Sequence, residues 1–103
     1  MSDLTTLSIL DLVDDEMIRA LATPANYRLG QAILQIGRVD LIESNPDRIS
    51  ARVNGSQRRK VSFWCDQGHL QWRCSCTLKQ RHVFCKHCVA LALTILNRAS
   101  TME

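Results

Sequence analysis

Four cysteines and two histidines fall within fifteen consecutive positions of this 103-residue chain, in the segment CSCTLKQRHVFCKHC at residues 74–88. Thiolate sulfur and imidazole nitrogen are the donors that zinc takes in structural sites, where four of them surround the ion as a tetrahedron. A disulfide framework fits less well, because the chain has five cysteines and an odd number leaves one over. The cluster therefore indicates a metal site.

The spacing allows four of these side chains to converge on one ion. Cys74 and Cys76 are expected at the end of an extended segment, where side chains two positions apart point the same way. Residues 77–84 form a return loop, after which Cys85 precedes a helix and His87 lies in its first turn. The positive end of that helix favours thiolate over thiol. We predict Zn²⁺ held by three cysteines and one histidine.

Other thiols in the segment leave alternatives open. Cys85 and Cys88 form a C-x-x-C pair, which would suit a redox pair or an all-cysteine zinc site in which Cys88 replaces His87. Cys88 also begins an apolar helical run, and Cys65 has the core-facing parity of its strand, so both are expected to be buried thiols. A thiol redox sensor using Cys65 or Cys88 is the least favoured function. The remaining histidines are expected in solvent: His69 and His82.

The predicted metal is structural, because four protein ligands leave no open position for water or substrate. Asp66 is the carboxylate nearest the cluster in the sequence, so no general base is clearly offered. The chain also lacks the G-x-x-x-x-G-K-[ST] loop of nucleotide hydrolases. We therefore expect a binding module and no enzyme activity.

The elements that position the cluster follow from the hydrophobic period. Residues 14–36 are predicted to be helical, with acids at the start, a Thr23–Pro24 N-terminus and a stop at Gly37. We expect Gly30 to interrupt the second part of this region. Its buried face is predicted to hold Tyr27, Ile33, Leu34 and Ile36.

After Gly37 the period changes to two. Residues 38–76 contain four alternating runs separated by the turn signals NPD, NG and DQGH, which indicates an antiparallel meander. An apolar helix follows CKH. The predicted fold class is α+β, in one domain over residues 1–103: N-terminal helices, an antiparallel sheet and a zinc-pinned C-terminal helix.

Charge is divided unevenly between the two halves of the chain. Residues 1–50 carry four basic and eight acidic side chains, net −4, and residues 51–103 carry nine and two, net +7. The solvent face of the sheet is expected to be basic with a tryptophan among the cations, which could bind the phosphates and a base of DNA or RNA. Arg59 has the core-facing parity, which predicts that the register can slip. The candidate nucleic-acid residues are Arg48, Arg52, Arg58, Lys60, Trp64, Arg73, Lys79 and Arg81.

The segment CSC, eight residues, then CKH resembles the SWIM zinc finger, whose pattern is Cys-x-Cys, a variable gap, Cys-x-His. The resemblance extends to WRCSC, to FCKH and its apolar helix, and to TPANYRLGQAILQIG ahead of the strands. It covers residues 20–97, with the finger at 72–97. It implies a ββα finger with the ligands Cys74, Cys76, Cys85 and His87.

The SWIM resemblance also implies partners. The family is associated with DNA and proteins, often within Swi/Snf-type helicases, transposases or recombination-mediator complexes. We therefore expect a protein-binding accessory subunit of a DNA helicase, remodelling or recombination ATPase. Direct DNA or RNA binding, through the basic sheet face and the 77–84 loop, is the alternative.

The expected surroundings are cytoplasmic, or nucleoid-associated if the protein is prokaryotic. No run of eighteen apolar residues predicts a membrane span, and MSDLTTLSILDLVDDE lacks the basic start of a secretory signal. The helix after CKH is apolar nearly all round, so it must be covered on every side. The cover is expected from the N-terminal helices, from a partner protein or from a second copy.

Overall fold

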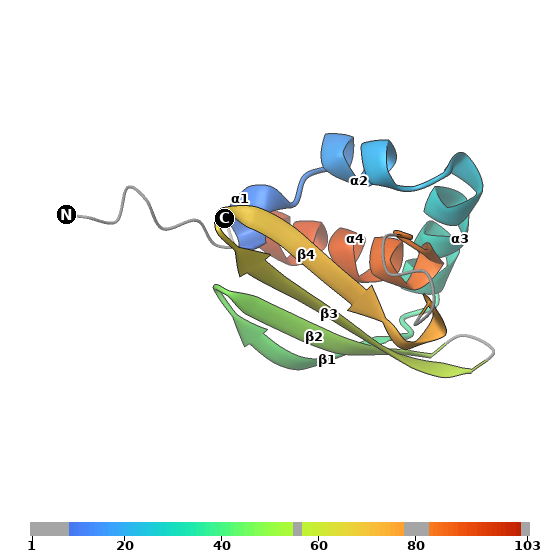
Figure 1. The fold of residues 1–103 in the computed structure, drawn as a ribbon. Helices are drawn as coiled ribbons and strands as arrows, with labels where there is room; N and C mark the ends of the chain where they lie inside the picture. Colours follow the sequence, from blue (N-terminus) through green and yellow to red (C-terminus); the bar gives the residue numbers. More distant parts are fainter. Residues whose placement is uncertain (1–8, 55–56, 78–82, 102–103) are drawn as a thin grey trace.

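The fold is α+β, as predicted, and has three layers in the computed structural model, which describes residues 9–54, 57–77 and 83–101 (Figure 1). A four-stranded antiparallel sheet forms the first layer. Helix α4 (Lys86–Thr101) crosses the inner face of this sheet and forms the second. Helices α2 (Asp15–Leu21) and α3 (Pro24–Gln35) lie on the other side of α4, and α1 (Ile9–Leu12) packs near its far end.

Helices α2 and α3 lie in the predicted helical region and begin at the predicted signals, whereas α1 lies ahead of that region. The Asp14 carboxylate caps α2 by accepting a hydrogen bond of 2.7 Å from the Met17 backbone N–H. The Thr23 hydroxyl caps α3 in the same way at 3.1 Å, and Pro24 follows as the first helical residue. Gly37 ends the region in the left-handed conformation, with φ +69°, and its N–H donates to the Leu34 carbonyl.

Two expectations for α3 are wrong. Gly30 does not interrupt the helix but lies buried in the middle of it, where α3 meets α4. Ile36 is 64% exposed instead of buried, because α3 ends at Gln35 and Ile36 is the C-cap residue, beyond the buried stripe of the helix. Tyr27, Gly30 and Ile33 form the buried stripe, at the i, i+3, i+6 spacing of one helix face.

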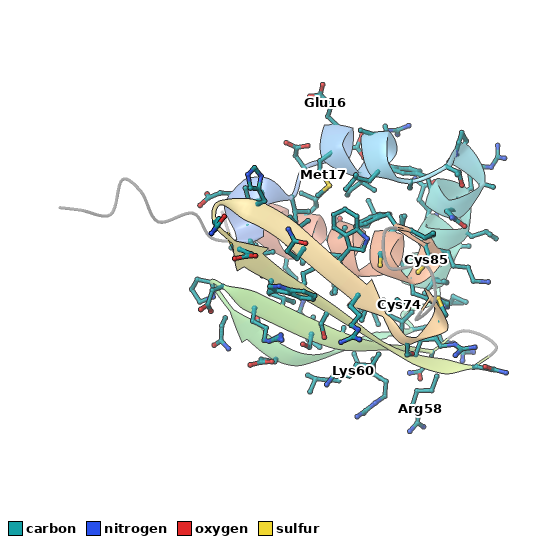
Figure 2. All side chains as sticks on the ribbon, viewed as in Figure 1. Glu16, Met17, Arg58, Lys60, Cys74 and Cys85 are labelled. Carbon is teal, nitrogen blue, oxygen red and sulfur yellow. The ribbon has the colours of Figure 1, made fainter. Side chains whose placement is uncertain are left out.

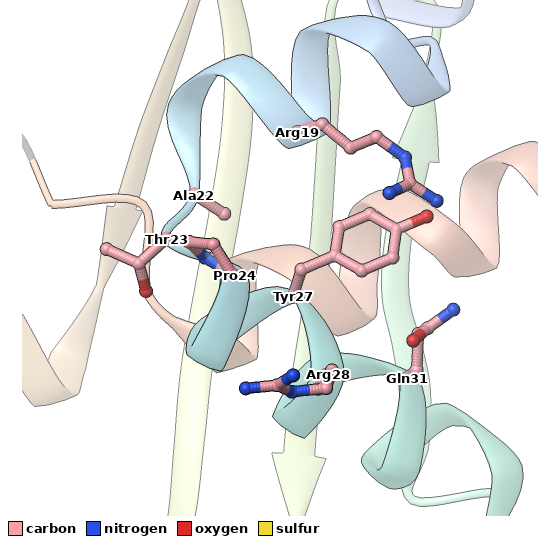
Figure 3. A pocket seen from close by; sticks show the side chains of 7 residues that line it. All are labelled: Arg19, Ala22, Thr23, Pro24, Tyr27, Arg28 and Gln31. Carbon is pink, nitrogen blue, oxygen red and sulfur yellow. The ribbon is translucent and has the colours of Figure 1, made fainter.

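Helix α2 is tied to α3 by a polar cluster above the core. The Tyr27 hydroxyl donates to the Asp15 carboxylate, and Arg19 donates to the same carboxylate at 2.7 Å. The Arg19 guanidinium also lies 4.3 Å from the centre of the Tyr27 ring, beside an open cavity of about 300 Å³ (Figure 3). The hydrogen bonds from Tyr27 and Arg19 lower the pKa of Asp15, so this carboxylate is ionised at neutral pH.

The sheet is the predicted meander. Strands β1 (Val39–Asn45), β2 (Arg48–Asn54), β3 (Arg58–Asp66) and β4 (His69–Cys74) lie in sequence order, each antiparallel to the next. The register between β2 and β3 is regular, so the expected slip is wrong: Arg59 pairs with Val53 and its guanidinium donates to Gln57. Positive φ angles at Gln67 and Gly68 close the last turn.

Helix α4 is covered by this same chain. Residues 88–92 are completely buried, between the inner face of the sheet and the three N-terminal helices. The core-facing parity predicted for the strands is confirmed, since Ala51, Val53, Val61 and Phe63 are all 0% exposed. This agrees with the expectation that the N-terminal helices cover the apolar helix. Within the described residues, none of the helices has the length and apolar character that crossing a membrane requires.

Candidate metal centre

The structure brings four metal-ligand side chains together where β4 ends and α4 begins, and two of them, Cys74 and Cys85, are labelled in Figure 2. The donor atoms of Cys74, Cys76, Cys85 and His87 all lie within 4.8 Å of one another, and all but Cys76 belong to buried residues. The histidine presents Nδ1, which lies 3.7 Å, 3.2 Å and 3.7 Å from the sulfurs of Cys74, Cys76 and Cys85. These four residues could hold a metal ion between strand and helix.

The first two cysteines meet by a different route from the one expected. The strand ends at Cys74, and Ser75–Thr77 form a turn of 3₁₀ helix, labelled η2, so the predicted extended conformation through Cys76 is wrong. Residues two apart in a strand have Cα atoms about 6.6 Å apart. The 3₁₀ turn curls Cys76 back, so the two sulfurs lie 3.3 Å apart and the Cys76 N–H approaches the Cys74 sulfur at 3.5 Å.

The second pair is placed by the helix start, as the sequence predicts. Helix α4 begins at Lys86, so Cys85 immediately precedes it and His87 lies in the first turn. The Cys85 carbonyl accepts the first helical hydrogen bond, 3.0 Å from the Val89 N–H. The Cys76 and Cys85 sulfurs are 3.5 Å apart, which joins the two halves of the cluster.

A fourth thiol lies near the cluster without being a member of it. Cys88 is completely buried on α4, as expected, with its sulfur 3.8 Å from that of Cys85.

The other candidate residues that the structure describes lie away from the cluster. Cys65 is only half-buried, so the expectation of a buried thiol is wrong there; it lies next to the β3–β4 turn. His69 is exposed at the start of β4, and His82 lies outside the described residues. None of the described cysteines forms a disulfide.

The thiols of the cluster differ in acidity. Hydrogen bonds with the Cys74 and Cys88 thiols lower the pKa of Cys85. A hydrogen bond to Cys85, together with burial, raises the pKa of Cys74, and burial raises that of Cys76. The thiolate therefore forms on Cys85, at the helix N-terminus, and a bound cation would displace the protons of Cys74 and Cys76.

Two features of the surroundings were not predicted. Phe84, next to Cys85, is buried between Phe63 and Trp72, with ring centres 5.9 Å and 5.2 Å away, and so fixes the chain where it enters the site. Burial raises the pKa of Cys76, and the charge of Arg59 opposes a small part of this rise. The positive charge of Arg59 would offset part of the negative charge of three metal-bound thiolates. The one sign of this in the sequence was that Arg59 has the core-facing parity of its strand, as the cysteine at the end of β4 does.

The candidate nucleic-acid residues lie on the other side of the sheet. Arg58 and Lys60 project from the face away from the helices (Figure 2). Strand pairing places Arg48, Arg52, Trp64 and Arg73 on the same face, on β2, β3 and β4. Lys79 and Arg81, expected in the return loop, lie outside the described residues. The sheet thus separates the cysteine cluster from the candidate nucleic-acid residues that the structure describes.

No protein-family model, curated protein or solved structure matches this chain.

Proposed function

We propose that this protein is a zinc-binding, non-enzymatic interaction module, and that its zinc is structural. The distances in the cluster carry the proposal. A tetrahedral zinc site, with Zn–S of about 2.3 Å and Zn–N of about 2.0 Å, puts sulfurs about 3.8 Å from each other and about 3.5 Å from the nitrogen. Two of the three sulfur pairs are 3.3 Å and 3.5 Å apart, the third pair, Cys74 and Cys85, lies within 4.8 Å, and the sulfurs are 3.2–3.7 Å from Nδ1.

The composition of the cluster supports a structural role. Three cysteines and one histidine complete the coordination of zinc, which leaves no position for substrate. Bound there, the ion would join the end of β4 to the start of α4, two elements that are separated by residues 75–85 along the chain. The ligands Cys74, Cys76, Cys85 and His87 are also those that the SWIM resemblance implies.

One zinc ion per chain is the expected result when the protein is purified without added metal and analysed by native mass spectrometry. Removal of the ion by a strong chelator should abolish the fixed aromatic environment of Phe63, Trp72 and Phe84, seen as loss of near-ultraviolet circular dichroism, because Phe84 adjoins the site. A folded chain without zinc, or a spectrum indifferent to the chelator, would contradict the proposal.

A surface on α3 supports protein binding. Leu29 and Ile36, two turns apart, are 48% and 64% exposed and line an open cavity of about 340 Å³. Arg38 and Lys86 border the same cavity. An amphipathic segment with apolar anchors and flanking acidic residues is the partner that matches this arrangement. In line with the SWIM resemblance, we propose that the segment belongs to a DNA helicase, remodelling or recombination ATPase.

Changing Leu29 and Ile36 together to glutamate is expected to abolish capture of the partner from native lysate, because two charges would enter an apolar contact. Capture by the unmodified protein should survive nuclease treatment. The control is Arg28→Glu, which adds negative charge on α3 beside Leu29 but outside this cavity and should leave capture intact. Equal capture by the double variant, or its loss on nuclease treatment, would contradict docking on α3.

A further inference from the structure

The outer face of the sheet contains a hollow with an unusual floor. Ser50 of β2 and Ser62 of β3 are paired in the register, and their hydroxyls lie 3.1 Å apart. Because both side chains are short, the longer ones around them stand above the floor, and Ser50 is only 2% exposed although it lies on the outer face. The hollow has a volume of about 550 Å³. It is lined by Arg48, Lys60, Ser62, Trp64, Arg73 and Ser75.

The charge of this hollow is not neutralised by the neighbouring strands. Arg48, Lys60 and Arg73 form no ion pair with a carboxylate in the described part of the chain. Three acids share the outer face: Asp40 and Glu43 of β1, paired with Arg52 and Ser50, and Asp66 at the end of β3. None of the three lines the hollow, and the Asp40 carboxylate accepts a hydrogen bond from Asn54. Positive charges held close together repel one another, and a bound anion would relieve this repulsion. The hollow is therefore suited to a ligand with negative charge.

An aromatic ring lies at one end of the hollow. Trp64 is half-buried, and the Arg48 guanidinium lies 5.5 Å from the centre of its ring. Trp64 is on the solvent face, whereas Trp72 of β4 is on the core face against Phe84. A tryptophan on the outer face beside an arginine offers a stacking surface for a planar group. The ligand should therefore combine negative charge with an aromatic ring.

We propose that this hollow is a binding site for single-stranded nucleic acid. Phosphates would contact Lys60 and Arg73, and one base would stack on Trp64, a contact that requires an unpaired base. The outer-face residues of β3 from Arg58 to Trp64 span about 20 Å, and Arg52 adds a cation beside Lys60. This track is of the length that a short site of about four nucleotides needs. The site is separate from the α3 surface and from the metal ligands.

The test uses the zinc-loaded full chain with fluorescein-labelled (dT)₁₂ and (U)₁₂, and anisotropy measured over a range of salt. We expect affinity to fall with salt, with a log–log slope of about −0.7 for each phosphate contacted. Trp64→Ala should weaken binding roughly 5- to 150-fold, the equivalent of about 1–3 kcal/mol for one stacked base, and Trp64→Phe should retain most of it. Lys60→Gln and Arg73→Gln should each reduce the slope by about 0.7.

Two controls separate this site from general electrostatic attraction. Arg28→Gln removes an equal charge from α3 and should leave both affinity and slope unchanged. In a Trp72→Phe variant, Trp64 is the remaining tryptophan, and its fluorescence should be quenched by the oligonucleotide. Should that variant not fold, the Trp64→Ala and Trp64→Phe comparison decides.

Three results would overturn the proposal: equal binding by Trp64→Ala and wild type, tighter binding of duplex than of single strand, or equal binding of heparin. Zinc content is measured on each sample. A zinc-loaded, folded protein that ignores oligonucleotides therefore refutes this site alone and leaves the proposed zinc module intact.

Discussion

The double variant Cys74→Ser/Cys76→Ser is expected to purify without zinc and without a stable C-terminal half. Binding of a structural zinc contributes on the order of 10 kcal/mol or more to the folding of small domains. The whole free energy of unfolding of such a domain is about 5–15 kcal/mol. The loss of two of the four ligands at the end of β4 should therefore remove most of the stability that fixes α4 against the sheet. Zinc content by native mass spectrometry and thermal unfolding by circular dichroism measure the two effects.

Serine nearly matches cysteine in size, so this variant changes metal binding much more than packing. Unmodified protein treated with a chelator should therefore unfold at the same temperature as the variant. Cys65→Ser is the matched control, because Cys65 is a half-buried thiol outside the cluster and should keep both the ion and the stability. A double variant that unfolds like the wild type would show that packing, not metal, holds α4 in place.

Gly30→Ala is expected to destabilise the protein by about 1–3 kcal/mol, the usual cost of an overpacked core. A Cβ at this position would lie 2.4 Å from Val89 Cγ1, 2.5 Å from Val89 Cβ and 2.9 Å from the Lys86 carbonyl oxygen. Val89 is completely buried and the Lys86 carbonyl is backbone, so neither can move alone. The helices must separate instead. The higher helix propensity of alanine, about 1 kcal/mol, offsets only part of this.

The same clash should weaken metal binding, because Lys86 lies between two residues of the cluster, Cys85 and His87. Separation of α3 from α4 would move the first turn of α4 away from Cys74. Denaturant unfolding and competition with a zinc chelator measure the two consequences. We expect Gly30→Ala to lower both the free energy of unfolding and the zinc affinity.

Three variants test the cause of this effect. Gln31→Ala makes a comparable exchange on the exposed side of α3 and should change stability by no more than about 0.5 kcal/mol. Gly37→Ala strains a left-handed residue with open space around it, so its cost should be independent of Val89. Gly30→Ala combined with Val89→Ala should cost less than the sum of the two single changes. Strict additivity of Gly30→Ala and Val89→Ala would exclude the clash as the cause.

Much of the fold could be predicted because its signals are local. The Thr23 cap and the stop at Gly37 depend on hydrogen bonds within one turn, and they lie where expected. The acids predicted at the start of α2 are also there, and Asp14 among them caps the helix. The alternation of β2 and β3 places Val53 and Val61 in the core because a strand has a period of two. These features need no knowledge of what the elements contact.

The ligand types and their spacing were equally visible. Three cysteines and a histidine in CSC…CKH can converge if a turn and a helix start follow one another, and the helix start at Lys86 was predicted. The turn was not. An extended segment points side chains i and i+2 the same way, whereas a 3₁₀ turn brings Cys76 back towards Cys74 by curling the backbone. The letters CSC carry no local signal that distinguishes the two conformations. The Ser75 hydroxyl, at the start of the 3₁₀ turn, accepts a hydrogen bond of 3.1 Å from the Lys60 N–H. Lys60 belongs to β3, so this contact of the turn depends on a strand that is distant in the sequence.

The sequence by itself determined the local elements, the parity of the sheet and the set of candidate ligands, since these follow from backbone sterics and side-chain chemistry within a few residues. The tertiary structure decided what depends on a distant partner. Gly30 is typical of a helix breaker, and only its contact with Val89 shows why it lies inside a helix. Ile36 is typical of a core residue, but α3 ends at Gln35 and leaves it exposed. The hollow between Lys60, Trp64 and Arg73 likewise exists only because the β2–β3–β4 register sets two serines side by side beneath longer side chains.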